Sequence, residues 1–190
     1  MKRNNYWELL LNPFTRIAGL QAFGLGLVFV ILMGIIGTFS HVRFDGVIDM
    51  HLVNQMTFIQ SFTLLAIDIL SIVIVMWITG VIVSGKIRFI DILGTMTLAK
   101  APFIILAIAG FFTKSPDQTE ILKNPGIILN SVSFIFLLIL TLPVMIWSII
   151  LMLNALKVSC DIKGSKLTAT FIIALLISEI ISKVLIYKFL

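Results

Sequence analysis

The sequence has few charged residues, and this shortage decides the class of protein. Only 12% of the 190 residues are Asp, Glu, Lys or Arg, whereas 59% are hydrophobic. A soluble domain of this size carries roughly 25% charged residues and is less than half apolar. The chain therefore cannot cover itself with polar surface in water, and lipid must be its solvent on most sides. The net charge of +5 is spread over several loops, so we expect no nucleic-acid partner.

Cysteine and histidine are equally scarce. Cys160 is the only cysteine, which excludes an intramolecular disulfide and a cysteine-based zinc site. His41 and His51 are the only histidines and lie outside the long apolar runs, which excludes a Ser–His pair or an HExxH zinc motif within the membrane. Asp68 is the only aspartate inside such a run, so an aspartate dyad is excluded too. We therefore expect neither an enzyme nor a cofactor.

Five long apolar runs make up most of the chain. A hydrocarbon core of about 30 Å requires about 20 apolar residues in a helix, and alternation of period two, the mark of a barrel strand, is absent. Helices satisfy their own backbone polar groups in lipid, so the sequence predicts an all-α, polytopic bundle of five transmembrane helices. The predicted spans are residues 17–39, 58–83, 92–112, 126–156 and 167–186.

The first sixteen residues differ in character from the rest. They contain Tyr6 and Trp7 beside three leucines, a combination that favours the membrane interface. No short apolar core with a cleavage site precedes the first span, so we expect that span to be retained. Pro13 should end the interfacial stretch. The chain then divides into a cytoplasmic interfacial segment, 1–16, and a transmembrane domain, 17–190.

Basic residues beside the spans predict the orientation, because cytoplasmic loops are enriched in lysine and arginine. Eight lie on one side and five on the other, which places the amino terminus in the cytoplasm and the carboxyl terminus outside. The first side holds Lys2, Arg3, Arg16, Lys86, Arg88, Lys157, Lys163 and Lys166, and the second holds Arg43, Lys114, Lys123, Lys183 and Lys188.

Small and polar residues recur along single helix faces. Two polar stripes should face the bundle interior, where they would form interhelical hydrogen bonds or line a cavity, two alternatives that the sequence leaves open. The stripes comprise Ser61, Asp68, Ser71 and Thr79 in the second span, and Asn130, Ser133, Thr141 and Ser148 in the fourth. A run of small residues in the first span, Ala18, Ala22, Gly26 and Gly34, should let a neighbouring helix approach closely. Pro102 and Pro143 should kink the third and fourth spans.

Charges within the spans are the strongest candidates for a functional site, since burying one in mid-bilayer costs about 2.5–3.5 kcal/mol. Asp68 and Lys100 differ in depth by ~3 Å when residues are counted from the outer ends of their spans and by ~10 Å when counted from the inner ends, so the sequence allows an ion pair between adjacent antiparallel helices without requiring it. It would be a dry pair that fixes helix register, or part of a proton or ion path; the further alternative is an unpaired Lys100 that extends towards the headgroups. Glu179 should pair with Lys183, one turn later and near the membrane surface.

The loop after the first span contains the residues most suited to a metal ion. His41, Asp45, Asp49 and His51 carry side chains that bind divalent ions. Their spacing matches no metal signature, so His41 and His51 are weak candidates for a metal site. We expect a solvated polar loop.

Three stretches together resemble the Yip (Ypt/Rab-interacting protein) domain family. They are Asn12-Pro13-Phe14; Ile92-Leu93-Gly94 with Ala99-Lys100-Ala101-Pro102-Phe103; and Trp147-Ser148, Leu156-Lys157 and Lys163-Gly164-Ser165-Lys166. The resemblance implies a five-helix bundle with a cytoplasmic amino terminus. Eukaryotic relatives are implicated in vesicle trafficking and in binding prenylated Rab GTPases. The Asp-Leu-Tyr-Gly-Pro motif is absent and Thr95 stands where tyrosine is frequent, so the chain is more similar to the prokaryotic branch.

The sequence therefore favours a non-enzymatic membrane scaffold or interaction protein of the Yip type, in the inner membrane if the source is prokaryotic. It would bind lipid or a protein partner through its cytoplasmic surface: Trp7, Arg16, Lys86, Arg88, Lys157, Lys163 and Lys166. The alternative is a small transporter or channel that uses Asp68 and Lys100 within the bundle. A homo-oligomer is compatible with both.

Overall fold

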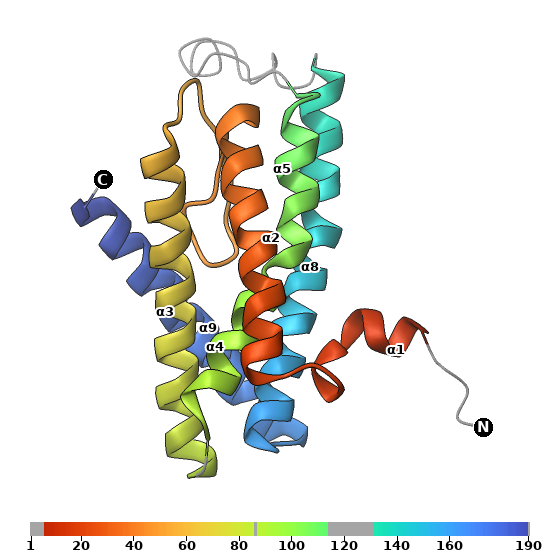
Figure 1. The fold of residues 1–190 in the computed structure, drawn as a ribbon, viewed down its shortest axis with the longest axis vertical. Helices are drawn as coiled ribbons and strands as arrows, with labels where there is room; N and C mark the ends of the chain where they lie inside the picture. Colours follow the sequence, from red (N-terminus) through yellow and green to blue (C-terminus); the bar gives the residue numbers. More distant parts are fainter. Residues whose placement is uncertain (1–5, 86, 114–130, 190) are drawn as a thin grey trace.

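The structure, a computed structural model, describes residues 6–85, 87–113 and 131–189. Its helices and strands follow the chain in the order α1 (Tyr6–Leu11), η1 (Pro13–Thr15), α2 (Gly19–Ser40), β1 (Val42–Arg43), β2 (His51–Leu52), α3 (Phe58–Ser84), α4 (Phe89–Ala99), η2 (Ala101–Phe103), α5 (Ile104–Gly110), α8 (Val132–Cys160) and α9 (Gly164–Phe189). Figure 1 shows the long helices side by side, with α9 crossing the bundle obliquely.

Five helices among the described residues are long and apolar enough to cross a membrane: α2, α3, α4 continued by α5, α8 and α9. The prediction of a multi-pass, five-span membrane protein is thus confirmed. Predicted and observed ends agree within four residues, apart from the start of the fourth span, whose residues 126–130 lie outside the described part. Local chemistry sets several ends. Thr57 and Gln60 form a reciprocal capping box at the start of α3, and Gly85, at φ +72°, ends it.

Small residues bring α2 and α4 into close contact, as their spacing predicted. Ala22 is fully buried, and a Cβ on Gly26 would lie 2.6 Å from the backbone nitrogen of Leu98. A Cβ on Gly94 would collide with the carbonyl oxygen of Gly19. Backbone therefore packs on backbone, the arrangement that small residues permit between membrane helices. Ala18 takes no part in this contact, because it is exposed at the start of α2.

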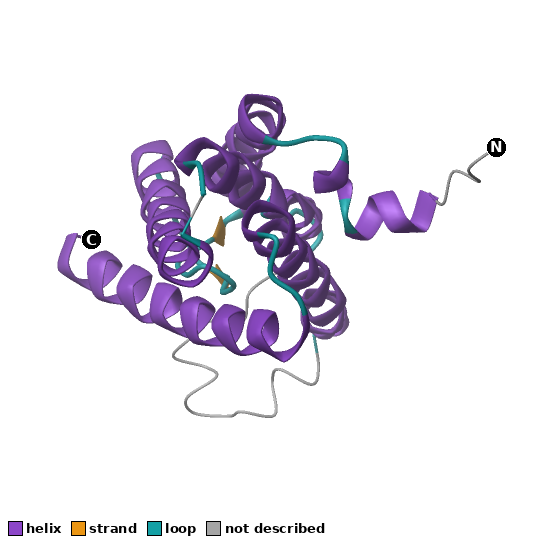
Figure 2. Ribbon diagram, turned by 90° about the horizontal axis from the view of Figure 1, so that it is seen from below, coloured by secondary structure: helices purple, strands orange, loops and turns teal. Residues whose placement is uncertain are grey.

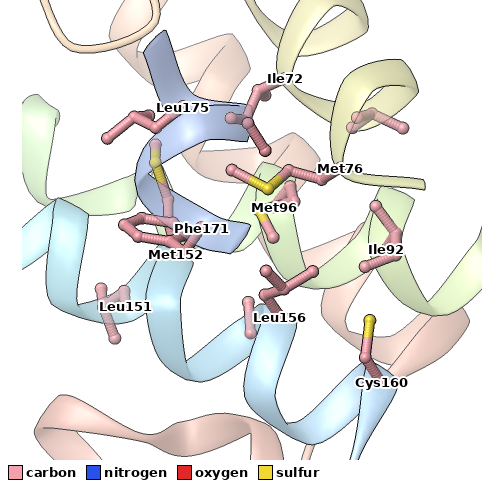
Figure 3. Packing of buried hydrophobic residues seen from close by; sticks show 14 of the residues in the cluster. Ile72, Met76, Ile92, Met96, Leu151, Met152, Leu156, Cys160, Phe171 and Leu175 are labelled. Carbon is pink, nitrogen blue, oxygen red and sulfur yellow. The ribbon is translucent and has the colours of Figure 1, made fainter. Parts of the chain in front are cut away.

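A large apolar core forms where α3, α4, α8 and α9 meet. Figure 3 shows Met76, Met96, Met152 and Phe171 turned towards one another from these four helices. All four are at most 3% exposed. Flexible thioether side chains fill irregular gaps between helices well, which suits a junction that α9 crosses at an angle.

The two prolines within the spans behave differently. Pro102 lies in η2, where the third span changes from α4 through a short 3-10 turn into α5. At Pro102, where a kink was predicted, the regular α-helix is interrupted next to Lys100. By contrast, α8 continues through Pro143 from Val132 to Cys160.

The amino-terminal segment forms a short helix that lies beside the bundle (Figure 1). Two side chains of α8 attach it: Trp147 Nε1 donates to the carbonyl oxygen of Leu10 at 3.0 Å, and Asn154 Nδ2 donates to that of Leu11 at 2.9 Å. These bonds satisfy carbonyl groups at the helix end, which lack partners within the helix.

The expectation of a solvated loop between the first two spans is wrong. Residues 42–52 form a hairpin in which Val42 pairs with Leu52 and Arg43 with His51. Figure 1 shows this segment descending from the ends of α2 and α3 towards the middle of the bundle, and Figure 2 shows both strands inside the ring of helices. Phe44 and Val47 are at most 1% exposed. Non-helical backbone is tolerated at membrane depth where protein buries it, and buried side chains supply its hydrogen bonds here.

Candidate functional site

The site centres on Lys100, which follows the last residue of α4 at the break in the third span. Its side chain is fully buried. Nζ donates hydrogen bonds to the carbonyl oxygens of Val47 at 2.7 Å and Gly46 at 3.3 Å, both at the inward tip of the hairpin. Lys100 thus supplies hydrogen bonds to two carbonyl groups in the interior of the bundle. Without them, burial of these polar groups would cost substantial free energy.

Asp68 of α3 is the counter-charge. Its carboxylate is fully buried, and Oδ2 lies 3.8 Å from Lys100 Nζ. The other oxygen, Oδ1, accepts a hydrogen bond from Ser182 Oγ of α9 at 2.5 Å. Oδ2 has no hydrogen-bond partner among the described residues. Four segments thus meet at one buried charge pair: α3, the end of α4, the hairpin and α9.

This geometry selects among the alternatives that the sequence left open for Lys100. The ammonium group does not extend to the headgroups, since its side chain is 0% exposed and faces Asp68. Both charges are enclosed by protein. The arrangement is that of a buried pair between α3 and the end of α4, with the hairpin tip as an additional partner.

α9 also binds the hairpin directly. Glu179 Oε2 accepts a hydrogen bond from the backbone N–H of Ile48 at 3.2 Å, and Lys183 Nζ lies 2.6 Å from Asp49 Oδ2. The expected Glu179–Lys183 pair is present at 3.7 Å. Both side chains also bind the hairpin, Glu179 through Ile48 and Lys183 through Asp49, which the sequence did not predict. A Cβ on Gly46 would collide with Glu179 Oε1, so glycine is required for this close approach.

The hairpin also gathers Asp45, Asp49 and His51, whose ligand atoms lie within 4.8 Å of one another. Cationic side chains already neutralise both carboxylates: Arg43 lies 3.2 Å and His51 2.8 Å from Asp45, and Lys183 pairs with Asp49. His41, the other weak metal candidate, is not part of this group; it lies exposed at the end of α2.

These neighbours shift the pKa values of two groups outside the spans. Burial acts to raise the pKa of Asp45, but the hydrogen bond and charge of His51, with the charges of Arg43 and Lys183, hold it below its usual 3.8. The hydrogen bond from His51 to Asp45 raises the pKa of the imidazole above 6.5, aided by the charges of Asp45 and Asp49. Between the folded pKa values of Asp45 and His51, this cluster is an ion-pair network.

Besides the Asp68–Ser182 bond, the polar stripes form interhelical hydrogen bonds at two further points. Ser61 Oγ donates to the carbonyl oxygen of Gly34 at 3.0 Å, and Ser148 Oγ donates to that of Ala99 at 2.7 Å. Thr141 bonds within its own helix, to Leu137. Asn130 lies outside the described residues.

Exposed basic residues collect at the bundle end opposite the hairpin entrance, which we call the basic end: Arg16, Arg88, Lys157, Lys163 and Lys166. A pocket of about 510 Å³ opens there between the end of α3 and the α8–α9 turn, lined by Ser84, Cys160, Asp161, Lys163 and Lys166 among others. Lys166 Nζ reaches the carbonyl oxygen of Val83 at 3.4 Å, and Arg88 pairs with Asp91 at 2.8 Å. Lys86 and the side chain of Trp7 lie outside the described part.

Sequence reasoning missed the hairpin tip and Ser182. Ser178, Glu179 and Ser182 follow one another at helical spacing in α9, and both serines are fully buried. That polar face could have indicated an inward-facing stripe in the last span. Nothing in Gly46-Val47 themselves signals burial next to a lysine.

No protein-family model, curated protein or solved structure matches this chain. The resemblance to the Yip domain family therefore rests on the sequence motifs alone.

Proposed function

We propose that this chain is a non-enzymatic integral membrane scaffold or interaction protein, of the Yip type, that acts through its basic end. The observation that carries the proposal is the complete burial of Asp68 and Lys100 in mutual contact. Such a pair, enclosed by protein and bound to backbone, suits a role in fixing the arrangement of helices and hairpin. The specific contacts would then be made elsewhere on the molecule.

The basic end is the surface that fits this role. Lys157 and Lys163 are exposed, and Lys163 and Lys166 line the pocket at the α8–α9 turn. The proposal places this end and the amino terminus in the cytoplasm, the carboxyl terminus outside, and the chain in the inner membrane of a prokaryote. A lysine near an anionic membrane surface contributes about 1 kcal/mol. The partner would be anionic lipid, an acidic protein surface, or both in a homo-oligomer.

Lipid preference tests the proposal. Purified protein would be titrated with phosphatidylglycerol and with phosphatidylcholine, and the triple variant Lys157→Gln/Lys163→Gln/Lys166→Gln should lose roughly tenfold or more of its preference for the anionic lipid. Lys188→Gln, an exposed lysine of α9 beyond the hairpin contacts, is the matched control and should retain it. Equal preference in wild type and triple variant would count against the basic end as a lipid-binding surface.

A second candidate function, a small transporter or channel, is favoured by a different observation. The third span is interrupted at Lys100–Phe103, next to a re-entrant hairpin and a buried charge pair. Interrupted helices and intramembrane charges occur together at transport sites. Proteoliposomes loaded with pH and cation indicators would test it by comparing wild type with Asp68→Asn. Fluxes at background in both would exclude this function.

A further inference from the structure

The contacts of Lys100 differ from those of an ordinary lysine–aspartate pair. Its shortest contacts are with two backbone carbonyl oxygens, Val47 O at 2.7 Å and Gly46 O at 3.3 Å, whereas the carboxylate oxygen lies at 3.8 Å. The two carbonyl oxygens and the carboxylate oxygen all approach the same atom, Lys100 Nζ. The lysine therefore lies in a cage of oxygen atoms.

The cage has the chemistry of a cation site. Backbone carbonyl oxygens released from regular structure coordinate small monovalent cations in membrane proteins. Asp68 Oδ2 is fully buried and, within the part of the chain that the structure describes, has Lys100 Nζ as its neighbouring cation and no hydrogen-bond partner. Asp68 contributes one negative charge, which one monovalent cation balances. Glu179 is a second carboxylate beside the hairpin, but it already binds the backbone N–H of Ile48 and the ammonium group of Lys183.

We infer that this cage is a binding site for a primary ammonium group, which the chain fills with its own Lys100, and that this internal ligand holds the hairpin within the bundle. The inference is independent of the proposed function at the basic end. The two carbonyl groups belong to the hairpin and the carboxylate to α3, so the ammonium group joins the loop to the helices. Without a cation, two carbonyl groups and a carboxylate would face one another in the bundle interior, and the tip would leave for water.

Chemical rescue tests the inference. Lys100→Ala removes three methylene groups and the ammonium group, and n-propylammonium restores all of them. n-Propanol has the same shape with a hydroxyl group, and tetramethylammonium has the charge without an N–H donor. Adding n-propylammonium at a tenfold excess over its dissociation constant should raise the Tm of purified Lys100→Ala by roughly 3–6 °C. Neither control ligand should do so.

The double variant Lys100→Ala/Asp68→Asn identifies the anion of the cage. It should lose the rescue by n-propylammonium, because the carboxylate no longer balances the ligand charge. Equal stabilisation of Lys100→Ala by n-propanol would mean that the ligand only fills a cavity, and would overturn the inference. Absence of any rescue would overturn it as well.

Hairpin position gives an independent measurement. Val47→Cys in a Cys160→Ser background, where it is the only cysteine, should react slowly with maleimide, because position 47 is fully buried. Adding Lys100→Ala should speed the reaction, and n-propylammonium should slow it again. If Lys100→Ala does not fold, it would be extracted in n-propylammonium and in tetramethylammonium. Recovery in the first alone supports the inference, and equal loss in both contradicts it.

Discussion

Two lysine–aspartate pairs beside the hairpin have opposite character. Lys183 and Asp49 approach to 2.6 Å at the mouth of the hairpin, where their side chains are 46% and 39% exposed. Lys100 and Asp68 are 3.8 Å apart, and both are 0% exposed. The shorter pair should contribute less, because exposed ion pairs are screened and are worth about 0–1 kcal/mol. The longer pair should matter more, because loss of one partner leaves a charge buried alone.

The largest expected effect is that of Lys100→Met. It should lower the free energy of unfolding by about 3–5 kcal/mol, since Asp68 would be left buried without its counter-charge. Detergent titration in mixed micelles measures this quantity. Asp68→Asn added to the same chain should recover part of the loss. Lys183→Met is the matched control and should cost less than about 1 kcal/mol. Equal losses at the two lysines would contradict the comparison.

An intermediate effect is expected at Glu179, whose side chain is 19% exposed, between the values for the two pairs. Glu179→Ala removes the acceptor for the Ile48 N–H and should cost about 1–3 kcal/mol. Glu179→Gln keeps an acceptor in the same place and should cost less. The same unfolding titration applies. If the two variants behaved alike, the hydrogen bond to Ile48 would not be what fixes this part of the hairpin.

The smallest effect is a pH dependence of the hairpin mouth. The pKa of His51 is raised, so its contribution is present below 6.5 and is lost as pH rises through the folded value. The pKa of Asp45 is lowered, so its contribution is present above 3.8 and is lost as pH falls through the folded value. Raising the pH from about 6 to about 8 should therefore lower stability by less than about 1 kcal/mol, because His51 is 56% exposed. In His51→Asn, Tm values at the two pH values should show that this difference has gone.

Much of this architecture could be predicted because lipid imposes a simple requirement on the sequence. Each span needs a run of apolar residues, and the five runs in the sequence correspond to the five long helices. The contact between Asp68 and Lys100 was one of the alternatives that the sequence allowed, since counting residues from either end of a span gives an approximate depth for each charge. Gly26 and Ala22 indicated close packing through their size and spacing, and α4 approaches α2 at these residues.

The hairpin could not be predicted because its position depends on partners distant in the chain. Residues 42–52 contain polar side chains, as an exposed loop would. Their inward course relies on Lys100, more than fifty residues later, and on Glu179, which is 131 residues from Ile48. The local sequence pattern of residues 42–52 does not indicate bonds to residues so distant in the chain. The sequence indicates that a charge within a span needs a partner, but it does not indicate that the partners of Lys100 include backbone carbonyl groups of a loop.

The dependence of the hairpin on α9 has a consequence for biosynthesis. Ser182, Glu179 and Lys183 belong to α9, which leaves the ribosome well after α3 and the first loop, and they bind Asp68 and that loop. Until α9 has entered the membrane, the α3 carboxylate lacks its Ser182 hydrogen bond and the hairpin lacks its outer attachments. The first loop therefore completes its folding only after α9 is inserted. A chain interrupted before α9 would present these unsatisfied groups to the proteases that remove incomplete membrane proteins.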